Sequence, residues 1–226
     1  MSNSSLVTHI NLSPNYSVVA NKQNKKITIH HMAGNLSVEA CGRIFANKSR
    51  GASSNYGVDS KGRIGMYVEE KHRSWCSSSR SNDIQAITIE VANDSKGPQW
   101  HVSDKALAAL IDLCTDICKR NGIKELKYTG DASGNLTKHE YFDNTNCPGP
   151  YLGGKFPYIA AEVNKRLASS QSSSSTSTSV SPLKRGSNGS RVKDLQTKLI
   201  YIGYGCGSKG ADASYGKATE SAVKEF

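Results

Sequence analysis

The sequence Leu136–Tyr151 reads LTKHEYFDNTNCPGPY, and the rest of the chain can be interpreted outward from it. Its His139 and Cys147 lie eight residues apart, and Pro148 directly follows the cysteine. This spacing is too short for two paired elements, which indicates a loop that folds around one metal ion. Zinc accepts nitrogen and sulfur ligands together, so it suits this imidazole and this thiolate. The stretch therefore predicts two ligands of a zinc site.

A third ligand must come from elsewhere in the chain. The candidate segment is Lys26–His31, KITIHH, a strand-like apolar run that ends in a histidine pair. Side chains alternate along a strand, so only one of His30 and His31 can point to the metal. Three protein ligands, with the fourth position left to water, are the composition of a catalytic zinc site, whereas structural sites usually close with four.

Four segments that follow one another in the chain make the pattern far more specific than any single motif. They are KITIHHMAG from Lys26, SSNYGVDSKGRIGMYVEEKHRSW from Ser53, AITIEVAND from Ala86 and LTKHEYFDNTNCPGP from Leu136. From about Ser13 to Leu167 the chain thereby resembles the zinc-dependent N-acetylmuramoyl-L-alanine amidases of type 2, which include phage lysins and the animal peptidoglycan-recognition proteins. The resemblance implies hydrolysis of the amide bond between N-acetylmuramic acid and L-alanine in bacterial peptidoglycan.

The same resemblance assigns roles to individual residues. The implied zinc ligands are His30, His139 and Cys147. His31 is then expected to pack on the other face of its strand. The general base of the family is either a hairpin tyrosine, whose position falls here on Ser54, or a strand glutamate, whose position is filled by Glu90. Serine is a poor base, so Glu90 is the expected one.

Further positions follow the family pattern around the substrate groove. Thr145 occupies a position at which lysine or threonine can donate to the oxyanion, although it is also suited to holding the loop. Trp75 matches an aromatic residue at the groove edge, and Cys76 stands where relatives often carry histidine. Tyr56 and Asn93 are expected either to line the groove as substrate-binding residues or to serve as core and turn residues.

Strand and helix patterns alternate along the first three quarters of the chain, which predicts an α/β fold with a central mixed sheet flanked by helices. The expected elements are a strand over 27–31, a helix capped by Ser37, a hairpin over 56–69, a strand over 86–91, a helix from Ser103 to Gly122, a strand over 123–129 and a helix from Pro157 to about Leu167. The polar residues 1–24 are expected to be an extended lead-in.

The serine-rich segment 169–181 divides the chain. Such a composition cannot bury a core, so it is expected to be a flexible linker between a catalytic domain at 1–168 and a second module at 182–226. The second module resembles a small helical peptidoglycan-binding domain in SRVKDLQTKLIYIGYGCG and GADASYGKATESAVKEF. That family usually continues further, which leaves open whether the module is cut short at Phe226.

The charge balance narrows the class of partner. The 226 residues include 29 basic and 19 acidic side chains, a net charge of +10, which favours polyanionic partners. No run of five or more like charges occurs, so a nucleic-acid binder is not expected, and acidic wall polymers suit the charge better. A non-catalytic peptidoglycan-recognition protein is the alternative function, but the cysteine ligand argues against it.

The beginning of the chain bears on where the protein is made. MSNSSLVTHINLSPNYSVV has neither the basic start nor the apolar run of a secretory signal. No stretch approaches the roughly 20 apolar residues of a membrane span, so no membrane association is expected. The six cysteines are expected to be reduced. Synthesis in the cytoplasm, with later access to the cell wall, favours a phage or prophage endolysin.

Overall fold

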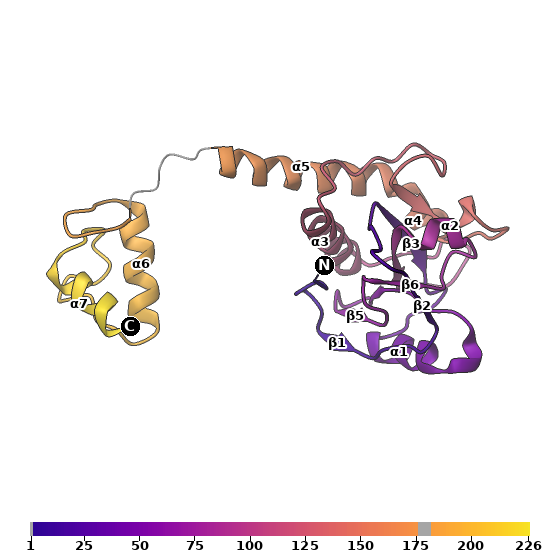
Figure 1. Cartoon of the computed structure of the whole chain (residues 1–226), viewed down its shortest axis with the longest axis horizontal. Helices are drawn as coiled ribbons and strands as arrows, with labels where there is room; N and C mark the ends of the chain where they lie inside the picture. The colour runs from indigo at the N-terminus through magenta and orange to yellow at the C-terminus, as the bar shows by residue number, and fades with distance from the viewer. Residues whose placement is uncertain (1, 176–181) are drawn as a thin grey trace. The chain divides into compact units, whose positions relative to one another are not determined.

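A computed structural model describes the backbone of residues 2–175 and 182–226, and the side chains of all of these residues except 170–175. The chain forms two compact units, Met1–Ser174 and Ser175–Phe226 (Figure 1). Part of the segment expected to be a flexible linker, residues 176–181, lies outside the described residues. No helix in the described ranges combines the length and the hydropathy that a membrane crossing requires.

The first unit is built on a six-stranded mixed sheet. Its strands, in spatial order, are β1 (His9–Ile10), β5 (Ile64–Met66), β4 (Tyr56–Val58), β7 (Ala86–Val91), β3 (Lys26–His31) and β8 (Leu136–Lys138). All neighbours are parallel except β4 and β5, which form the expected antiparallel hairpin. A separate antiparallel pair joins β2 (Tyr16–Val18) to β6 (His72–Ser74).

Helices complete this unit and cover the sheet. They are α1 (Val38–Ala46), the 3-10 turn η1 (Lys48–Arg50), α2 (Arg80–Asp83), α3 (Asp104–Asn121), the 3-10 turn η2 (His139–Tyr141), α4 (Pro150–Gly154) and α5 (Phe156–Ser175). The expected helix caps are present. The side chains of Ser37 and Ser103 each accept a hydrogen bond from the backbone N–H three residues further along the chain, and Gly122 ends α3 in the left-handed conformation, with φ 70°. The predicted α/β fold is confirmed.

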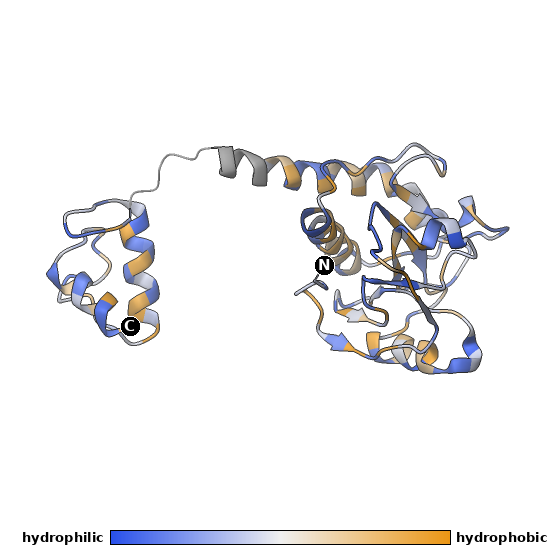
Figure 2. Cartoon of the chain, in the orientation of Figure 1, coloured by the Kyte–Doolittle hydropathy of each residue, from blue (hydrophilic) through white to orange (hydrophobic). Residues whose placement is uncertain are grey.

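The two faces of the central strands differ in polarity because side chains alternate along a strand. On β3 and β7 the isoleucines Ile27, Ile29, Ile87 and Ile89 are fully buried in one core with the apolar stripes of α3 and α5. Figure 2 shows these stripes along both helices. The opposite face of the same strands carries Thr28, His30, Thr88 and Glu90. The apolar face therefore supports the fold and leaves the polar face to the site.

Two expectations about strands were wrong. Residues 123–129 form no strand, because Asn164 of α5 satisfies the backbone of Leu126 instead, with N···O distances of 2.8 and 3.0 Å. The next segment, β8, pairs with β3 in its place. The supposed lead-in 1–24 contributes both β1 and β2, short strands that a polar composition does not reveal.

Helix α5 also differs from the expectation, because it continues past Leu167 to Ser175. Ile159, Val163 and Leu167 anchor its first part in the core. Once a helix is formed, each further residue adds one hydrogen bond, and neither glycine nor proline occurs between Leu167 and Pro182. The first residues of the expected linker are therefore helical.

The second unit consists of α6 (Ser190–Tyr201) and α7 (Lys217–Glu225) around a small core of Leu199, Cys206 and Ala222. Gln196 is fully buried on α6, and its amide nitrogen donates to Asp212, Ser214 and Thr219 at 2.9–3.0 Å. This one side chain ties the connecting loop to both helices. The expected helical character of this module is confirmed.

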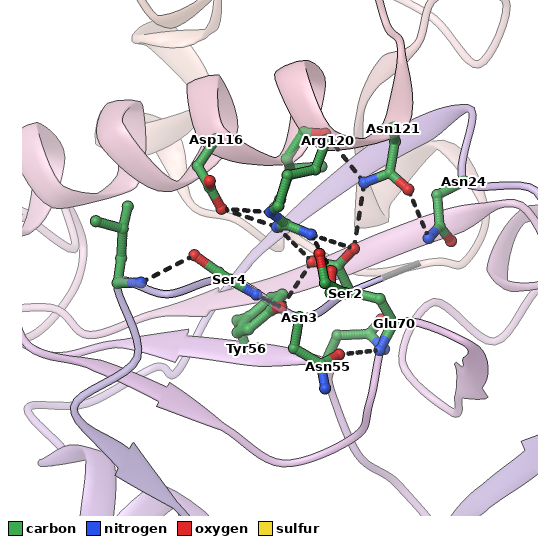
Figure 3. A network of polar contacts seen from close by, with 12 residues as sticks. Ser2, Asn3, Ser4, Asn24, Asn55, Tyr56, Glu70, Asp116, Arg120 and Asn121 are labelled. Atoms are coloured by element: carbon green, nitrogen blue, oxygen red, sulfur yellow. Dashed lines mark hydrogen bonds and ion pairs between the residues drawn. The ribbon is translucent and has the colours of Figure 1, made fainter.

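A buried ion pair links α3 to the loop between β5 and β6 (Figure 3). The guanidinium of Arg120 donates to both carboxylate oxygens of Glu70, at 2.6 and 2.9 Å, and Glu70 is 1% exposed. Tyr56 donates to the same carboxylate at 2.6 Å, and the backbone N–H of Ser4 donates to Tyr56 at 3.0 Å. The N-terminal segment, the hairpin and α3 are thereby held at one point.

Substitution of Arg120 by alanine should therefore destabilise the first unit strongly. It leaves the Glu70 carboxylate buried without its cation, which costs about 3 kcal/mol or more in the free energy of unfolding. Urea unfolding of the full chain measures the change. The control is Lys127→Ala, whose ion pair with Glu125 is exposed, with side chains 62% and 59% accessible, and should change the free energy by less than about 1 kcal/mol. Equal effects of the two substitutions would contradict this account.

Candidate metal centre and active site

The site is built where three parallel strands end side by side. His30 on β3 is the register partner of Glu90 on β7, so their side chains lie on the same face. On the other side of β3, Ile29 is paired with Lys138 of β8, which places His139 beside His30. The two imidazole rings are 4.5 Å apart between centroids. The sheet register alone thus brings together three groups that the sequence analysis assigned to the site.

Cys147 reaches the same place through the loop after β8. The backbone N–H of Glu140 donates to its carbonyl at 3.0 Å, and its own N–H donates to the Thr145 hydroxyl at 3.3 Å. The N–H of His31 donates to its sulfur at 3.4 Å. Backbone donors directed at sulfur stabilise the thiolate form that metal binding requires.

The expected zinc ligands converge. The donor atoms of His30, His139 and Cys147 all lie within 4.8 Å of one another. Nε2 of His30 and Nε2 of His139 are buried and have no hydrogen-bond partner among the described residues. Burial lowers the pKa of both imidazoles, and it raises the pKa of the Cys147 thiol while no cation is near. Neutral imidazoles with unpartnered nitrogens and one thiol are a donor set that fits zinc.

Three threonines, one from each strand, form a polar floor below these groups. The hydroxyls of Thr28 and Thr137 are 2.9 Å apart, and that of Thr88 is 2.7 Å from Ser74. Asn82 donates to Thr28 at 2.9 Å. The hydroxyls of the three threonines are thus all hydrogen-bonded although they are buried, which helps to hold the strand ends in place.

The converging groups open into a cavity of about 450 Å³. Glu90, Thr145, Trp75 and all three expected ligands line it. The indole N–H of Trp75 donates to Ser17 at 2.8 Å, which fixes the ring at the cavity wall. Thr145 serves as an acceptor for the Cys147 backbone, so it holds the loop and keeps its own hydroxyl proton for donation.

Glu90 carries the electrostatic signature of a proton-transfer group. Its Oε2 is buried and has no partner among the described residues. Burial raises the pKa of Glu90 to about 8, and the charge of Arg50 partly opposes that rise. A carboxyl group with a pKa near neutrality beside a metal centre is suited to general base or general acid work.

Two of the expected groove residues lie elsewhere. Tyr56 is fully buried, and its hydroxyl is engaged by Glu70 below the sheet, so it cannot contact a substrate. Asn93 is also fully buried and donates to the carbonyl of Trp100 at 2.8 Å. His31, as expected, turns away from His30. Its ring packs edge-on against that of Trp100, with 5.4 Å between the ring centroids.

Other cavity residues were not expected from the sequence. Cys41, Ile44 and Phe45 of α1 line the cavity, as does Arg50 of η1. The helical spacing of the α1 residues indicated burial but not which face of the sheet they cover. Cys76 forms a second donor group with His30 and Glu90, which no spacing in the sequence signals.

Comparison with known protein families agrees with this geometry. Residues 20–150, more than half of the chain, match the family described as N-acetylmuramoyl-L-alanine amidase. The chain belongs to this family. Residues 188–226 match the family described as a peptidoglycan binding domain. The amidase match contains every element that brings a residue to the candidate site, from β3 to the Cys147 loop.

Individual relatives of this amidase-family chain are distant. N-acetylmuramoyl-L-alanine amidase CwlL of Bacillus licheniformis is 28% identical over 204 residues, which cover 81% of this chain and 53% of that protein. The chain thus spans about half the length of the curated relatives it matches.

Solved structures share the fold at lower identity. The catalytic domain of PlyG is 17% identical, with a TM-score of 0.56 over 70% of this chain and 93% of that one. The Staphylococcus aureus hydrolase AmiA is 16% identical, with a TM-score of 0.56 over 75% and 93% of the two chains. Both likenesses show a common fold.

The raised pKa of Glu90 predicts a pH-dependent stability of the metal-free protein. Between the ordinary carboxyl pKa and about 8, the folded state keeps a proton on Glu90 that the unfolded state has lost. The contribution of Glu90 to the free energy of unfolding therefore falls as the pH rises through this window. Glu90→Gln removes this loss. The Tm of the variant minus that of the unsubstituted protein should increase by roughly 10 °C from pH 5 to pH 8.

Thermal unfolding of chelator-treated protein measures this difference. Glu125→Gln, at a carboxyl group with a 59% accessible side chain, is the control and should give a difference that is flat with pH. A flat difference for Glu90→Gln as well would contradict the assigned pKa.

Proposed function

We propose that this protein is a zinc-dependent N-acetylmuramoyl-L-alanine amidase that hydrolyses the bond between N-acetylmuramic acid and L-alanine in peptidoglycan. One observation carries the proposal: the donor atoms of His30, His139 and Cys147 converge at the wall of a cavity that Glu90 also lines, and Oε2 of Glu90 is buried there without a hydrogen-bond partner among the described residues. Membership of the amidase family supports the choice of bond, and the match of residues 188–226 supports the choice of polymer.

The protein groups divide the work of amide hydrolysis. When bound by His30, His139 and Cys147, zinc supplies Lewis-acid polarisation of a carbonyl and lowers the pKa of water. Glu90 takes a proton from the attacking water and passes it to the leaving nitrogen, a role suited to a carboxyl group with its pKa raised toward neutrality. The Thr145 hydroxyl donates to the oxyanion, and Trp75 presents a flat face to sugar or stem peptide.

A non-catalytic recognition protein is the second candidate function. Such a protein needs the cavity but not the complete donor set. Here Cys147 is buried beside both histidines, and the N–H of His31 is directed at its sulfur. A complete ligand set favours hydrolysis over binding alone.

We further propose that the protein acts as an endolysin, with peptidoglycan as its partner. The pairing of an amidase-family unit with a wall-binding module supports this role. A structure described as a mutant endolysin from Bacillus subtilis, 19% identical with a TM-score of 0.52, has the same fold. Cells that produce the protein should lyse only after their membrane is permeabilised, and lysis without permeabilisation would contradict this role.

Digestion of purified walls tests the proposed reaction. New N-terminal alanine with intact glycan strands, identified by mass analysis, is the expected product. Glu90→Gln should retain zinc and fold but lower the rate by roughly 10²–10⁴-fold, because proton transfer is lost. Cys147→Ser should lower zinc content and rate together while wall binding through the second unit persists.

Cys206→Ser, in the core of the second unit, is the matched cysteine control and should leave zinc content unchanged. New reducing ends, or new peptide termini other than alanine, would refute the proposed bond. Full activity of Cys147→Ser would refute the ligand set.

A further inference from the structure

A second group of donor atoms lies in the same cavity. The donor atoms of His30, Cys76 and Glu90 all lie within 4.8 Å of one another, and the Cys76 sulfur is 4.0 Å from Oε1 of Glu90. Imidazole nitrogen, thiolate sulfur and carboxylate oxygen all bind zinc at about 2.0–2.3 Å, so donors on one ion lie roughly 3–4 Å apart. Small side-chain rotations suffice to place all three on one ion.

Two of these groups are buried without compensation. His30 is 1% exposed, and its Nε2 has no hydrogen-bond partner among the described residues. Oε2 of Glu90 is also buried without a hydrogen-bond partner among the described residues. Buried polar atoms that lack partners are costly, and a cation is a ligand that would satisfy both. Cys76 is half-buried at the cavity wall, so an entering ion can reach its sulfur.

Cys76 has no task in the proposed hydrolysis, yet it changes which ions the cavity can hold. A thiolate prefers soft cations, so it adds affinity for Zn²⁺ and still more for Cd²⁺ over Mg²⁺ or Ca²⁺. Binding forms one sulfur–metal bond, breaks the S–H bond and releases that proton to solvent, with no change in oxidation state.

We propose that His30, Cys76 and Glu90 form a second site for a soft divalent cation, Zn²⁺ in excess or Cd²⁺, and that an ion held there inhibits the enzyme. The inhibition rests on the proposed function: Nε2 of His30 can bind only one ion, so a second ion held by His30, Cys76 and Glu90 would leave His139 and Cys147 to the first ion and would occupy the carboxylate of the general base. The binding itself does not rest on that function, since it requires only the three donors.

Titration of the full-length protein with Cd²⁺ tests the binding through the ultraviolet charge-transfer band of cadmium–thiolate. In Cys147→Ser the thiol of the first site is absent, so the band that remains should come from Cys76. The double variant Cys147→Ser/Cys76→Ser should lose it, and Cys147→Ser/Cys206→Ser should keep it. Circular dichroism confirms that each variant is folded.

Inhibition of wall hydrolysis by excess Zn²⁺ provides the second measurement, with each rate divided by the maximal rate of the same variant. The zinc concentration that halves the rate should rise by about tenfold or more in Cys76→Ser and stay unchanged in Cys206→Ser.

Three results would overturn the second site. The first is loss of the band in Cys147→Ser alone. The second is unchanged zinc inhibition in Cys76→Ser. The third is weaker binding of the first zinc equivalent in Cys76→Ser, which would make Cys76 a ligand of the same ion. If the protein does not cut walls at all, the cadmium band still decides whether the donors bind.

Discussion

The parallel pairing of β3 between β7 and β8 is the constraint on which the rest of the site depends. It sets His30 opposite Glu90 and beside His139. Because side chains alternate along strands, a shift of one residue in either pairing would turn a ligand or the carboxyl group into the apolar core. The buried isoleucines of β3 and β7 oppose such a shift, since it would expose them. The hydrophobic face therefore fixes the geometry of the polar one.

Burial of the polar face costs free energy, and its groups are of two kinds, those that are hydrogen-bonded within the protein and those that are not. The hydroxyls of Thr28, Thr137, Thr88 and Ser74 are hydrogen-bonded to one another or to the amide nitrogen of Asn82, so they add rigidity. The imidazole nitrogens and one oxygen of Glu90, directly above the threonine floor, are left without partners among the described residues. Buried groups that lack partners next to a satisfied layer mark the place where a ligand must complete the structure.

The sequence predicted that His30 and Glu90 lie on the polar face of the sheet because both residues are in strongly patterned strands, whereas their roles were implied by the family resemblance. The runs KITIHH and AITIEV alternate clearly, so the faces of His30 and Glu90 follow from them. Tyr56 was ambiguous because its strand has only three residues, all of them buried, and alternation cannot tell which side is the core. The segment 123–129 has strand composition, but Asn164, far along the chain, decides how its backbone is satisfied.

Separation along the chain also explains why other features could not be predicted from the sequence. The carboxylate of Glu70 accepts from Tyr56 of the hairpin and from Arg120 of α3, and the backbone N–H of Glu70 donates to Asn3 of the N-terminal segment. No local pattern connects these residues. In the sequence, Cys76 differs from the histidine that relatives often carry, and nothing near it indicates a contact with Glu90. Its approach to Glu90 depends on how the loop after β6 packs on β7. Patterns of neighbouring residues predict elements, whereas contacts between distant loops require coordinates.

X-ray absorption at the zinc edge, on protein loaded with one equivalent of zinc, tests the central geometry most directly. Convergence of two imidazoles and one thiolate predicts one sulfur neighbour at about 2.3 Å and nitrogen or oxygen neighbours at about 2.0 Å, with a histidine pattern beyond them. A first shell without sulfur, or with two sulfur atoms, would contradict the assignment of His30, His139 and Cys147 as the ligands.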